Sequence, residues 1–431
     1  MSASAVESVS EVGKKEHGAS PGGRRSLIFI NRFFHPDHSA TSQIVSDLAF
    51  SLAAHGEPVQ VITSRGLYDK PEAQLPIHEI VNDVEIHRVA TPRFGRNSLV
   101  GRAIDYLNMY WAFATAAARI ARPGDILIAK TDPPLLSVPI SLVARAKRLH
   151  LINWLQDLYP EVAIQLGVDA LRPVAPLLTW ARNASLRAAD VNVAIGELMA
   201  KRIERAGVSR DRIAVVVNWC DDEKIDPQLH YNNPLRREWG LEGKFVVGYS
   251  GNLGRAHEYQ TMLGAAEILR GRTDIVFLFI GGGHLSGPMK DAIEARGLAE
   301  KFLFRPYQPP HLLPQSLTIP DIHWLSLTPA MEGLIVPSKL YGILAAGRPT
   351  IAVTDRDGEV ARTVLKSDCG LHALPGDSPA LADAIAALAD SAQTTARMGG
   401  NARKLLDSNF SRERAFELWR RVIVAVDGFS R

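Results

Sequence analysis

Hydrophobic and polar positions alternate along the chain on two length scales. Short apolar runs of about four to eight residues predict buried strands, and longer segments with apolar residues at every third or fourth position predict helices. The first unit has a strand at Ser26–Asn31, a helix that Ser42 caps and Gly56 ends, and a strand at Val59–Thr63. A strand, a helix and a strand within about forty residues form a βαβ unit, which predicts a parallel sheet.

The same alternation continues to the end of the chain, interrupted by the polar segment Cys220–Glu242, which we interpret as a linker region. Before it, we expect strands at Val84–Arg88, Ile126–Lys130, His150–Leu155, Val191–Ile195 and Ile213–Val217, and helices at Leu99–Ile120, Leu135–Lys147, Val174–Ala188 and Gly196–Ala206. After it, we expect strands at Phe245–Ser250, Val276–Ile280, Phe302–Arg305, Asp321–Leu327, Thr350–Val353 and Gly370–Ala373, and helices at Glu258–Leu269, Lys339–Ala346 and Arg412–Asp427.

Two alternating sets predict an α/β protein with two Rossmann-like, parallel-sheet domains. We expect a disordered tail at residues 1–25, one domain at 26–225, a second at 226–410, and a final helix at 411–431 that packs back on the first domain. The length of 431 residues fits two domains, because single hydrophobic cores stop growing at about 250–300 residues. Open parallel sheets bind ligands at the carboxyl ends of their strands, so we expect a cleft between those ends.

Composition and charge exclude several classes of protein. The net charge is only +3, so the chain as a whole gives no argument for nucleic-acid binding. The N-terminal stretch Met1–Gly23 is rich in Ser and Gly and lacks the apolar core of a signal peptide. No apolar run approaches the roughly 20 residues needed to span a bilayer. The two cysteines, Cys220 and Cys369, fit a reducing cytoplasm and offer no metal site.

The segment Glu332–Val353 contains the strongest candidate site. Leu334–Val336 is a short apolar run, and Ser338 then occupies the N-cap position of a helix that starts at Lys339. A helix N-terminus presents unpaired N–H groups and about half a positive charge, which suits a phosphate. A carboxylate just before it, Glu332, could hold sugar hydroxyls. An ordinary αβ unit explains the same pattern, and both interpretations stay open on these residues alone.

This segment, with its motif Pro-Ser-Lys-Leu-Tyr-Gly, resembles the nucleotide-sugar site of family 4 glycosyltransferases, which are retaining enzymes of the GT-B fold. It is most similar to the bacterial polysaccharide subgroup that includes colanic-acid and amino-sugar O-antigen transferases. The resemblance implies that Glu332 contacts the donor sugar, and the family's second glutamate, which contacts the ribose, would fall at Gly342. The neighbouring residues implied to line the site are Gly333, Leu334, Ile335, Pro337 and Ser338.

Three other strand-end loops in the second half add candidate donor-binding residues. Glycines in the loop Ser250–Gly254 let backbone amides approach an anion closely. The resemblance implies that Gly251, Asn252 and Gly254 hold the diphosphate and that Arg255 and Lys339 neutralise its charge. It places Gly282 and Gly283 against the nucleotide and Tyr307 near the base. Plain tight turns and a half-buried core tyrosine are the alternatives.

Three other groups of residues carry possible chemistry. Asp157 follows a strand in the first half and is the best acid/base or orienting group there, with a helix N-cap as the alternative. His35 and His38 have the spacing of a metal-binding pair, but no cysteine or acidic cluster completes a site, so we expect no zinc there. Asp355 and Asp357 have the spacing that binds a divalent ion in GT-A transferases, and we interpret them as a solvated turn.

The helix at Leu99–Ile120 has two apolar sides. We expect one side to pack on the sheet, namely Val100, Ile104, Leu107, Trp111, Ala114 and Ala118. The other side carries Tyr106, Met109, Tyr110 and Phe113, close to Arg96 and Arg102. Aromatic and basic residues together suit a membrane interface, although a core helix explains them equally well. From residue 93 to 148, nine Lys/Arg against three Asp give a net charge of +6, a candidate patch for an anionic partner.

The resemblance and the residues together predict a retaining glycosyltransferase of the hexosyltransferase type. We expect transfer from a UDP- or GDP-sugar to a polyprenyl-diphosphate-linked saccharide at the inner membrane surface, in exopolysaccharide, capsule or O-antigen biosynthesis. The expected catalytic residues are Glu332, Asp157, Lys339 and Arg255. We expect a cytoplasmic protein that needs no metal or other cofactor and binds no nucleic acid. The alternatives are a non-catalytic sugar-nucleotide-binding scaffold and a GT-B sugar-nucleotide epimerase, which would act without an acceptor.

Overall fold

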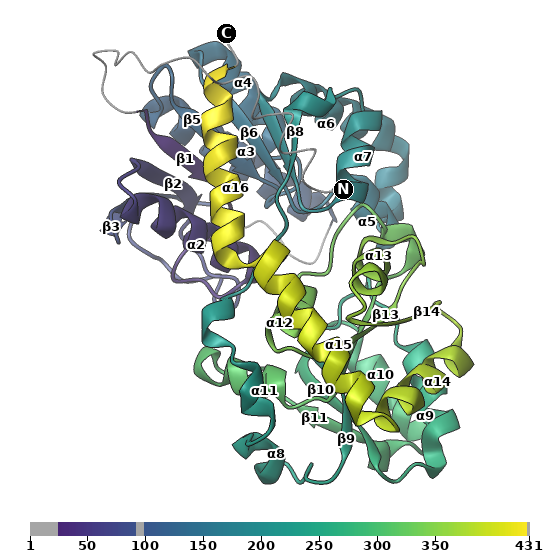
Figure 1. Ribbon diagram of the computed structural model, residues 1–431. Coiled ribbons are helices and arrows are strands. Elements are labelled where there is room, and N and C mark those ends of the chain that lie inside the picture. The colour runs from purple at the N-terminus through teal and green to yellow at the C-terminus, as the bar shows by residue number, and fades with distance from the viewer. Residues whose placement is uncertain (1–24, 92–98, 429–431) are drawn as a thin grey trace. The chain divides into compact units, whose positions relative to one another are not determined.

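The computed structural model describes residues 25–91 and 99–428, which form two compact units. The N-terminal unit comprises the described residues of Met1–Val217 and Phe416–Arg431, and the C-terminal unit is Asn218–Ala415. Each unit is a β-sheet of mainly parallel strands with helices packed on it (Figure 1). The expected α/β class with two parallel sheets is therefore confirmed.

The sheet of the N-terminal unit contains, within the described residues, eight strands in the order β3-β4-β2-β1-β5-β6-β7-β8. Neighbouring strands run parallel, except for β3 and β4, which form an antiparallel hairpin at the edge. The strands are β1 (Leu27–Ile30), β2 (Val59–Ser64), β3 (His78–Val81), β4 (Val84–Val89), β5 (Ile126–Lys130), β6 (His150–Leu155), β7 (Val191–Ala194) and β8 (Ile213–Val215).

The helices of the N-terminal unit mostly connect consecutive parallel strands. They are α2 (Ala40–Ala54), α3 (Leu99–Ile120), α4 (Ser137–Lys147), α5 (Glu161–Gln165), α6 (Ala175–Ala188) and α7 (Glu197–Arg205), with the 3-10 turns η1 (Asp169–Val174) and η2 (Arg210–Arg212). The last long helix, α16 (Arg412–Ala425), belongs to this unit from Phe416 onward. Its Trp419 is fully buried and packs edge-on against Trp154 of β6, with ring centroids 4.6 Å apart.

The sheet of the C-terminal unit has six strands within the described chain, in the order β11-β10-β9-β12-β13-β14, and all neighbours are parallel. The strands are β9 (Phe245–Asn252), β10 (Ile275–Gly282), β11 (Phe302–Arg305), β12 (Ile322–Ser326), β13 (Thr350–Val353) and β14 (Gly370–Ala373). The helices are α8 (Pro234–Glu238), α9 (Gln260–Ile268), α10 (Ser286–Ala295), α11 (Leu313–Thr318), α12 (Lys339–Ala345), α13 (Glu359–Lys366), α14 (Ser378–Ala389) and α15 (Ala392–Leu405).

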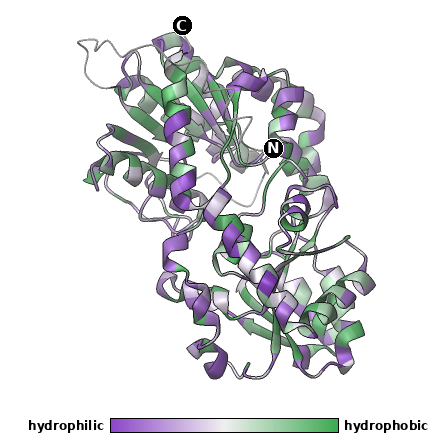
Figure 2. Ribbon diagram, viewed as in Figure 1, coloured by the Kyte–Doolittle hydropathy of each residue, from purple (hydrophilic) through white to green (hydrophobic). Residues whose placement is uncertain are grey.

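Burial explains why the strands were visible in the sequence. The central strands β1, β5, β12 and β13 are buried along their whole length, because helices cover both faces of a parallel sheet. Figure 2 accordingly shows hydrophobic residues concentrated on the strands of both sheets. Each fully buried large aliphatic side chain contributes about 1.5–3 kcal/mol relative to an exposed one.

The start of α2 differs from the expectation. The helix begins at Ala40 with Ser39 as its N-cap, so Ser42 lies inside the first turn. Ser42 is fully buried, and its hydroxyl has no hydrogen-bond partner among the residues that the structure describes. A serine followed by an apolar periodic run is a typical cap signal, but here Ser39 stands three residues earlier in the extended conformation that an N-cap requires.

Helix α3 has the expected bounds but the opposite orientation. The large residues predicted to pack on the sheet are exposed: Ile104 is 41% exposed, Leu107 65% and Trp111 74%. The side chain of Val100 lies outside the described residues. The other side, with Met109 and Phe113, is buried against β1, β5 and α4. The prediction was wrong because both sides of the helix are apolar, so periodicity alone could not choose between them.

The polar segment Cys220–Glu242 is folded into the C-terminal unit instead of forming an open linker. Ile225, Leu235 and Leu241 are buried, and the Asn233 side chain donates to the carbonyl oxygen of Gln315 at 2.7 Å. These apolar residues are spaced singly among charges, so no periodic pattern revealed them. The expected set of elements also omitted β3 and several helices, among them α10 and α13.

Candidate functional site

Each sheet has a point at which the strand order reverses. In the C-terminal unit the chain winds outward from β9 to β11 on one side and from β12 to β14 on the other, so the reversal lies between β9 and β12. In the N-terminal unit it lies between β1 and β5. Open parallel sheets bind ligands beside such a point, outside the carboxyl ends of the strands. The loops that follow these four strands are therefore where a ligand is expected.

Glycines at the carboxyl ends of β9 and β10 let two backbone segments approach each other closely. Gly251 and Gly281 are neighbours in the parallel register and have φ angles of 119° and 129°. A Cβ on Gly281 would collide with the carbonyl oxygen of Gly251, and one on Gly283 would collide with the backbone of Leu253. These positions require glycine, and the backbone of Gly251, Gly281 and Gly282 stays partly exposed.

Tyr307, after β11, rests on these glycines. A Cβ built on Gly282 would lie 3.4 Å from a ring carbon of Tyr307, so the ring covers the glycine backbone. The residue is nevertheless 59% exposed, which contradicts the alternative of a half-buried core tyrosine. An exposed aromatic ring at the end of a parallel strand can stack on a nucleobase.

Lys339, the first residue of α12, extends across Gly251 toward the end of β9. Its Nζ donates to the Tyr249 hydroxyl and, at 3.1 Å, to the carbonyl oxygen of Asn252. It also lies 4.1 Å from the centroid of the Tyr249 ring. Burial lowers the pKa of Lys339 to about 7, and no acidic residue of the described chain opposes that shift. An anionic ligand at this place would supply the charge that stabilises the ammonium.

His257 completes this cluster, and no motif in the sequence had predicted it. Its Nδ1 lies 2.6 Å from the carbonyl oxygen of Ser326 at the end of β12, and its Nε2 lies 3.4 Å from Lys339 Nζ. Burial, together with the charge of Lys339, lowers the pKa of His257 to about 4. The ring is therefore neutral at pH 7, so Nδ1–H donates to Ser326 and Nε2 faces Lys339. His257 thus links β9 and β12 at the reversal point and helps to position Lys339.

The carboxylate of Glu332 lies against the first turn of α13. Its Oε2 accepts the backbone N–H of Glu359 at 3.3 Å. A Cβ on Gly358 would collide with the carboxylate, so glycine at that position leaves room for it. Burial, and then the charges of Asp355 and Glu359, raise the pKa of Glu332 to about 7 despite the bond from the Glu359 N–H. A carboxyl with such a pKa is typical of functional sites, and its contact with the donor sugar stays a prediction.

The other residues predicted for the donor site lie on the same loops. Leu334 and Pro337 are buried, whereas Arg255 and Ser338 are exposed. Gly254 and Ile335 are of intermediate exposure, and Gly333 is buried. Gly342 is buried inside α12, where an added Cβ would already lie 3.4 Å from Leu317. A longer side chain at this position would therefore start in contact with Leu317.

Asp355 and Asp357 form a turn before α13. Asp355 Oδ1 accepts the backbone N–H of Asp357 at 2.8 Å, and Asp357 forms an ion pair with Arg362 at 3.6 Å. The side chain of Asp357 is 88% exposed. The two carboxylates thus have turn-forming and surface roles in this structure, as the solvated-turn interpretation expected.

The N-terminal unit holds a second group of ionisable side chains with shifted pKa values, at the carboxyl ends of β5 and β6. Lys130 and Asp157 line a small pocket together with Tyr159 and Arg182. Burial raises the pKa of Asp157 to about 6, and the nearby Asp132 raises it further while Lys130 opposes the shift. Burial likewise raises the pKa of Asp132 to about 6 and lowers that of Lys130 to about 7. Lys130 Nζ also donates to the carbonyl oxygen of Thr41 at 2.9 Å.

Asp157 was predicted as an orienting group at this strand end, but Lys130 and Asp132 were counted only as surface charge. One sequence signal could have identified Lys130. It ends an otherwise apolar strand, which is typical of a buried position, and its side chain is fully buried in the structure. Buried lysines are rare unless they are paired, so a lysine in such a strand indicates a charged partner nearby.

Two family models match the chain. The one described as "Glycosyl transferase 4-like domain" matches residues 39–219, and "Glycosyl transferases group 1" matches residues 232–405. The probable glycosyltransferase WbjE of Pseudomonas aeruginosa is 27% identical over 329 residues, which cover 74% of this chain and 79% of WbjE. The putative colanic acid biosynthesis glycosyl transferase WcaI of Escherichia coli K12 is 25% identical over 53% of this chain and 58% of WcaI.

Solved structures share the fold. Anabaena HepE, determined in complex with UDP, matches with a TM-score of 0.69 at 16% identity, covering 94% of this chain and all of the HepE chain. WaaG, a glycosyltransferase involved in lipopolysaccharide biosynthesis, matches with a TM-score of 0.64 at 12% identity, covering 94% of this chain and all of WaaG.

Proposed function

The chain belongs to the glycosyltransferase family whose two domains these models describe, with the GT-B fold, and we propose that it transfers a hexose with retention from a nucleoside-diphosphate sugar to a lipid-linked saccharide. The pathway we propose is bacterial polysaccharide biosynthesis, because the name of the relative WcaI assigns that protein to colanic acid biosynthesis. Donor class, acceptor class and stereochemistry are all part of the proposal.

The observation that carries the donor assignment is the environment of Lys339. A partly buried ammonium at the β9–β12 reversal has uncharged hydrogen-bond partners and a pKa lowered to about 7. Partly exposed backbone of Gly251 lies beside it, and Tyr307, which covers the partly exposed Gly282, offers a ring for a base. A diphosphate at Lys339 with its nucleoside toward Tyr307 would use all of these features. HepE was determined with UDP and with UDP-glucose, which supports UDP as the first nucleotide to test.

Transfer in this site would break the bond between the anomeric carbon of the sugar and the oxygen of the diphosphate. Negative charge then builds up on the departing diphosphate, and fixed positive groups stabilise it. We assign this role to Lys339, with Arg255 and the backbone amide of Gly251 as further donors. Glu332 is assigned to hydroxyls of the donor sugar. In this proposal, protein groups supply the charge stabilisation and no metal is required.

The acceptor is assigned to the N-terminal unit. Lys130, Asp132 and Asp157 gather beside the β1–β5 reversal, where titratable groups with displaced pKa values suit proton transfer or orientation of a hydroxyl. Asp157 would orient the acceptor hydroxyl, and the positive charge of Lys130 would stabilise the ionised form of the Asp157 carboxyl.

An exposed apolar surface supports a lipid-linked acceptor. Helices α3, α4 and α6 pack side by side in the N-terminal unit. Their large apolar residues that are more than 60% exposed are Leu107, Trp111, Leu142, Leu177 and Trp180. Exposed Arg119, Arg145 and Arg148 lie on or next to the same helices. Aromatic, aliphatic and basic side chains on neighbouring helices suit the interface of an anionic bilayer.

We therefore propose peripheral binding to the cytoplasmic face of the inner membrane. None of the helices in residues 25–91 and 99–428 is long and apolar enough to cross a bilayer. Arg93 and Arg96 of the expected basic patch, and the side chain of Arg102, lie outside the described residues.

The test is a transfer assay with UDP- and GDP-sugars and synthetic polyprenyl-diphosphate saccharides. The proposal expects a product only when donor and acceptor are both present, with the anomeric configuration of the donor kept in the product, as read by NMR. Inversion of that configuration would contradict the retaining assignment. A changed donor without acceptor would identify an epimerase, and nucleotide binding without any product across the acceptor panel would favour the scaffold.

A further inference from the structure

The edge hairpin of the N-terminal sheet carries two histidines and a glutamate on one face. Strands β3 and β4 are joined by Asn82 and Asp83, whose φ angles of 48° and 61° are those of a tight two-residue hairpin turn. In the register that this turn fixes, His78 lies directly opposite His87, and Glu85 lies two residues before His87 on β4. Because side chains alternate along a strand, all three share a face of the sheet.

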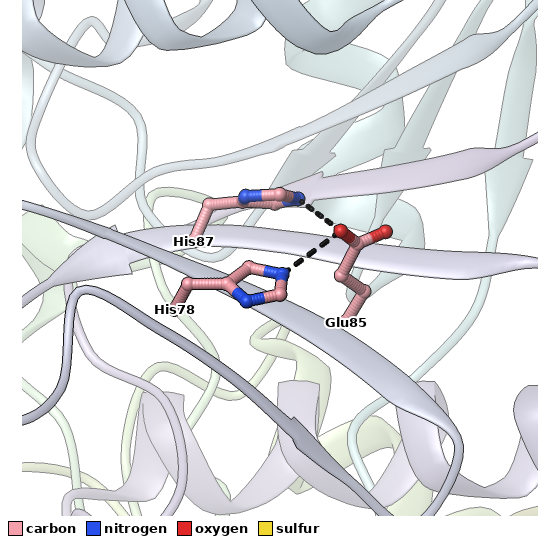
Figure 3. Close-up of side chains that lie close together, drawn as sticks. All are labelled: His78, Glu85 and His87. Atoms are coloured by element: carbon pink, nitrogen blue, oxygen red, sulfur yellow. Dashed lines mark hydrogen bonds and ion pairs between the residues drawn. The ribbon is translucent and has the colours of Figure 1, made fainter.

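The three side chains converge on one point. Figure 3 shows both imidazole rings directed at the Glu85 carboxylate. His78 Nε2 lies 2.9 Å and His87 Nε2 lies 3.5 Å from the same oxygen, Glu85 Oε1. One ligand atom of each residue lies within 4.8 Å of the others. In a tetrahedral zinc site with bonds of about 2.0–2.1 Å, neighbouring ligand atoms are about 3.3–3.4 Å apart. The two observed nitrogen-to-oxygen distances are close to the edge length of such a tetrahedron.

We propose that His78, Glu85 and His87 form a Zn²⁺ site with one position open to water. Two imidazoles and one carboxylate are a donor set that zinc takes in sites with an open position. The side chains of His78 and Glu85 are 52% and 41% exposed, which leaves an entry path for the ion. The Oε1 atom of Gln60 on β2 lies 3.2 Å from His87 Nε2 and borders the site.

The opposite face of the hairpin holds the ligands in position. Val84 and Ile86 of β4 are completely buried. Between them and the strand end, the buried Arg88 side chain forms an ion pair with Glu79 of β3 and donates to the carbonyl oxygen of His35 at 2.8 Å. The backbone that carries the three ligands is thus fixed by packing and ion pairing on the other side. Zinc would bind with small side-chain rotations and would cross-link β3 to β4.

The site lies away from the residues assigned to transfer. In the strand order, β2 and β1 separate the hairpin from β5, which ends in Lys130. The alternative is a polar cluster without an ion, in which Glu85 accepts a hydrogen bond from His78 and the ring of His87 is bonded to Gln60. The two interpretations differ in one measurable property, the affinity of the hairpin for zinc.

The experiment is calorimetric titration of the full-length protein, stripped with EDTA, with Zn²⁺. The proposal expects one zinc per chain, and binding weakened at least tenfold in His78→Gln and in Glu85→Gln, since even the loss of a residue that only hydrogen-bonds to a ligand costs about 10–100-fold in affinity. Cobalt substitution provides a second readout, because tetrahedral Co²⁺ absorbs strongly in the visible range and octahedral Co²⁺ does not.

His38→Gln is the matched control, because His38 is an exposed histidine of the same unit outside the cluster. This variant should bind zinc as tightly as the wild type. Thermal unfolding in EDTA checks that each variant is folded. His78 and Glu85 are chosen for substitution because both side chains are partly exposed, whereas a change at the less exposed His87 could also disturb folding. Absence of one-to-one zinc binding by the wild type would overturn the proposal. So would unchanged affinity in His78→Gln and Glu85→Gln, or loss of binding in His38→Gln.

Discussion

Replacing Lys339 by methionine separates its contribution to ligand binding from its effect on stability. Methionine keeps an aliphatic stem over Gly251 and removes the charge. Burial holds the pKa of Lys339 at about 7, against 10.5 for an ordinary lysine, which corresponds to a cost of about 4 kcal/mol for the ammonium at pH 7. Tyr249 and Asn252 each lose a donor in the variant, at about 1 kcal/mol each. The ligand-free variant should therefore be more stable than the wild type by about 2 kcal/mol.

The pH dependence of this gain has a definite sign. The folded pKa of Lys339 lies below its unfolded value, so between about pH 7 and 10.5 the unfolded chain binds more protons than the folded one. The free energy of unfolding of the wild type should then rise with pH in this range. Lys339→Met lacks this contribution, and its advantage should shrink as the pH is raised from 7 to 9. Thermal unfolding at the two pH values measures both effects.

UDP should reverse the order of stability of the two proteins, so that the wild type becomes more stable than Lys339→Met. A hydrogen bond to a charged group contributes about 1.5–3 kcal/mol, so Lys339→Met should bind UDP about 10–100-fold more weakly in a calorimetric titration. Lys404→Met, at an exposed lysine of α15, is the control and should match the wild type. The reasoning is refuted if Lys339→Met binds UDP as tightly as the wild type, or if the ligand-free variant is less stable at pH 7.

Three further predictions concern the glycine loops, the N-terminal cluster and the membrane surface. Gly281→Ala, with φ at 129° and a Cβ that would meet Gly251, should lose about 2 kcal/mol of stability in denaturant unfolding. Gly271→Ala, where nothing lies within 4 Å, should not, and equal losses in both would contradict the packing argument. The raised pKa of Asp157, about 6, means that its stabilising contribution is present below pH 4 and lost as the pH rises through 6. Asp157→Asn should therefore reduce the fall in the free energy of unfolding between pH 4 and 8. An equal fall in the wild type and the variant would contradict the raised pKa of Asp157. Trp111→Ser should leave stability within about 0.5 kcal/mol, because the residue is 74% exposed, and should weaken sedimentation with phosphatidylglycerol vesicles. Tyr231→Ser, at an exposed aromatic of the other unit, is its control. Equal vesicle binding by both variants would contradict the assignment of α3 to the membrane-binding surface.

The buried strands were the most predictable part of the fold. Ile126–Lys130, His150–Leu155 and Thr350–Val353 were placed with their observed bounds, because both faces of a parallel strand are buried and the apolar run ends where burial ends. Strand β3 was missed for the opposite reason. It is an edge strand whose residues alternate between exposed and half-buried positions, so its pattern is weak.

Helix faces and caps were less predictable, because they depend on neighbours that lie far away in the sequence. The orientation of α3 is set by contact with α4 and the sheet, not by its own periodicity. Ser42 had the composition of a cap, but its position in α2 is set by the loop that precedes it.

The candidate site was predicted where a motif carried it and missed where only tertiary contacts define it. Lys339 and Gly251 belong to recognisable loop patterns, and the structure brings them together. His257 and Asp132 have ordinary sequence surroundings, and their significance comes from the partners at the sheet reversals. No spacing rule reports such partners before the fold is known.

The most direct test of the central claim is thermal unfolding of the protein with UDP, GDP, ADP and CMP, each with and without Mg²⁺. A ligand at one hundred times its dissociation constant stabilises a protein by about 2.7 kcal/mol, which is easily measured. A donor site built around Lys339 predicts a rise in the unfolding temperature with one nucleoside diphosphate, of the same size without Mg²⁺. A rise that strictly requires Mg²⁺, or no rise with any of the four nucleotides, would contradict it.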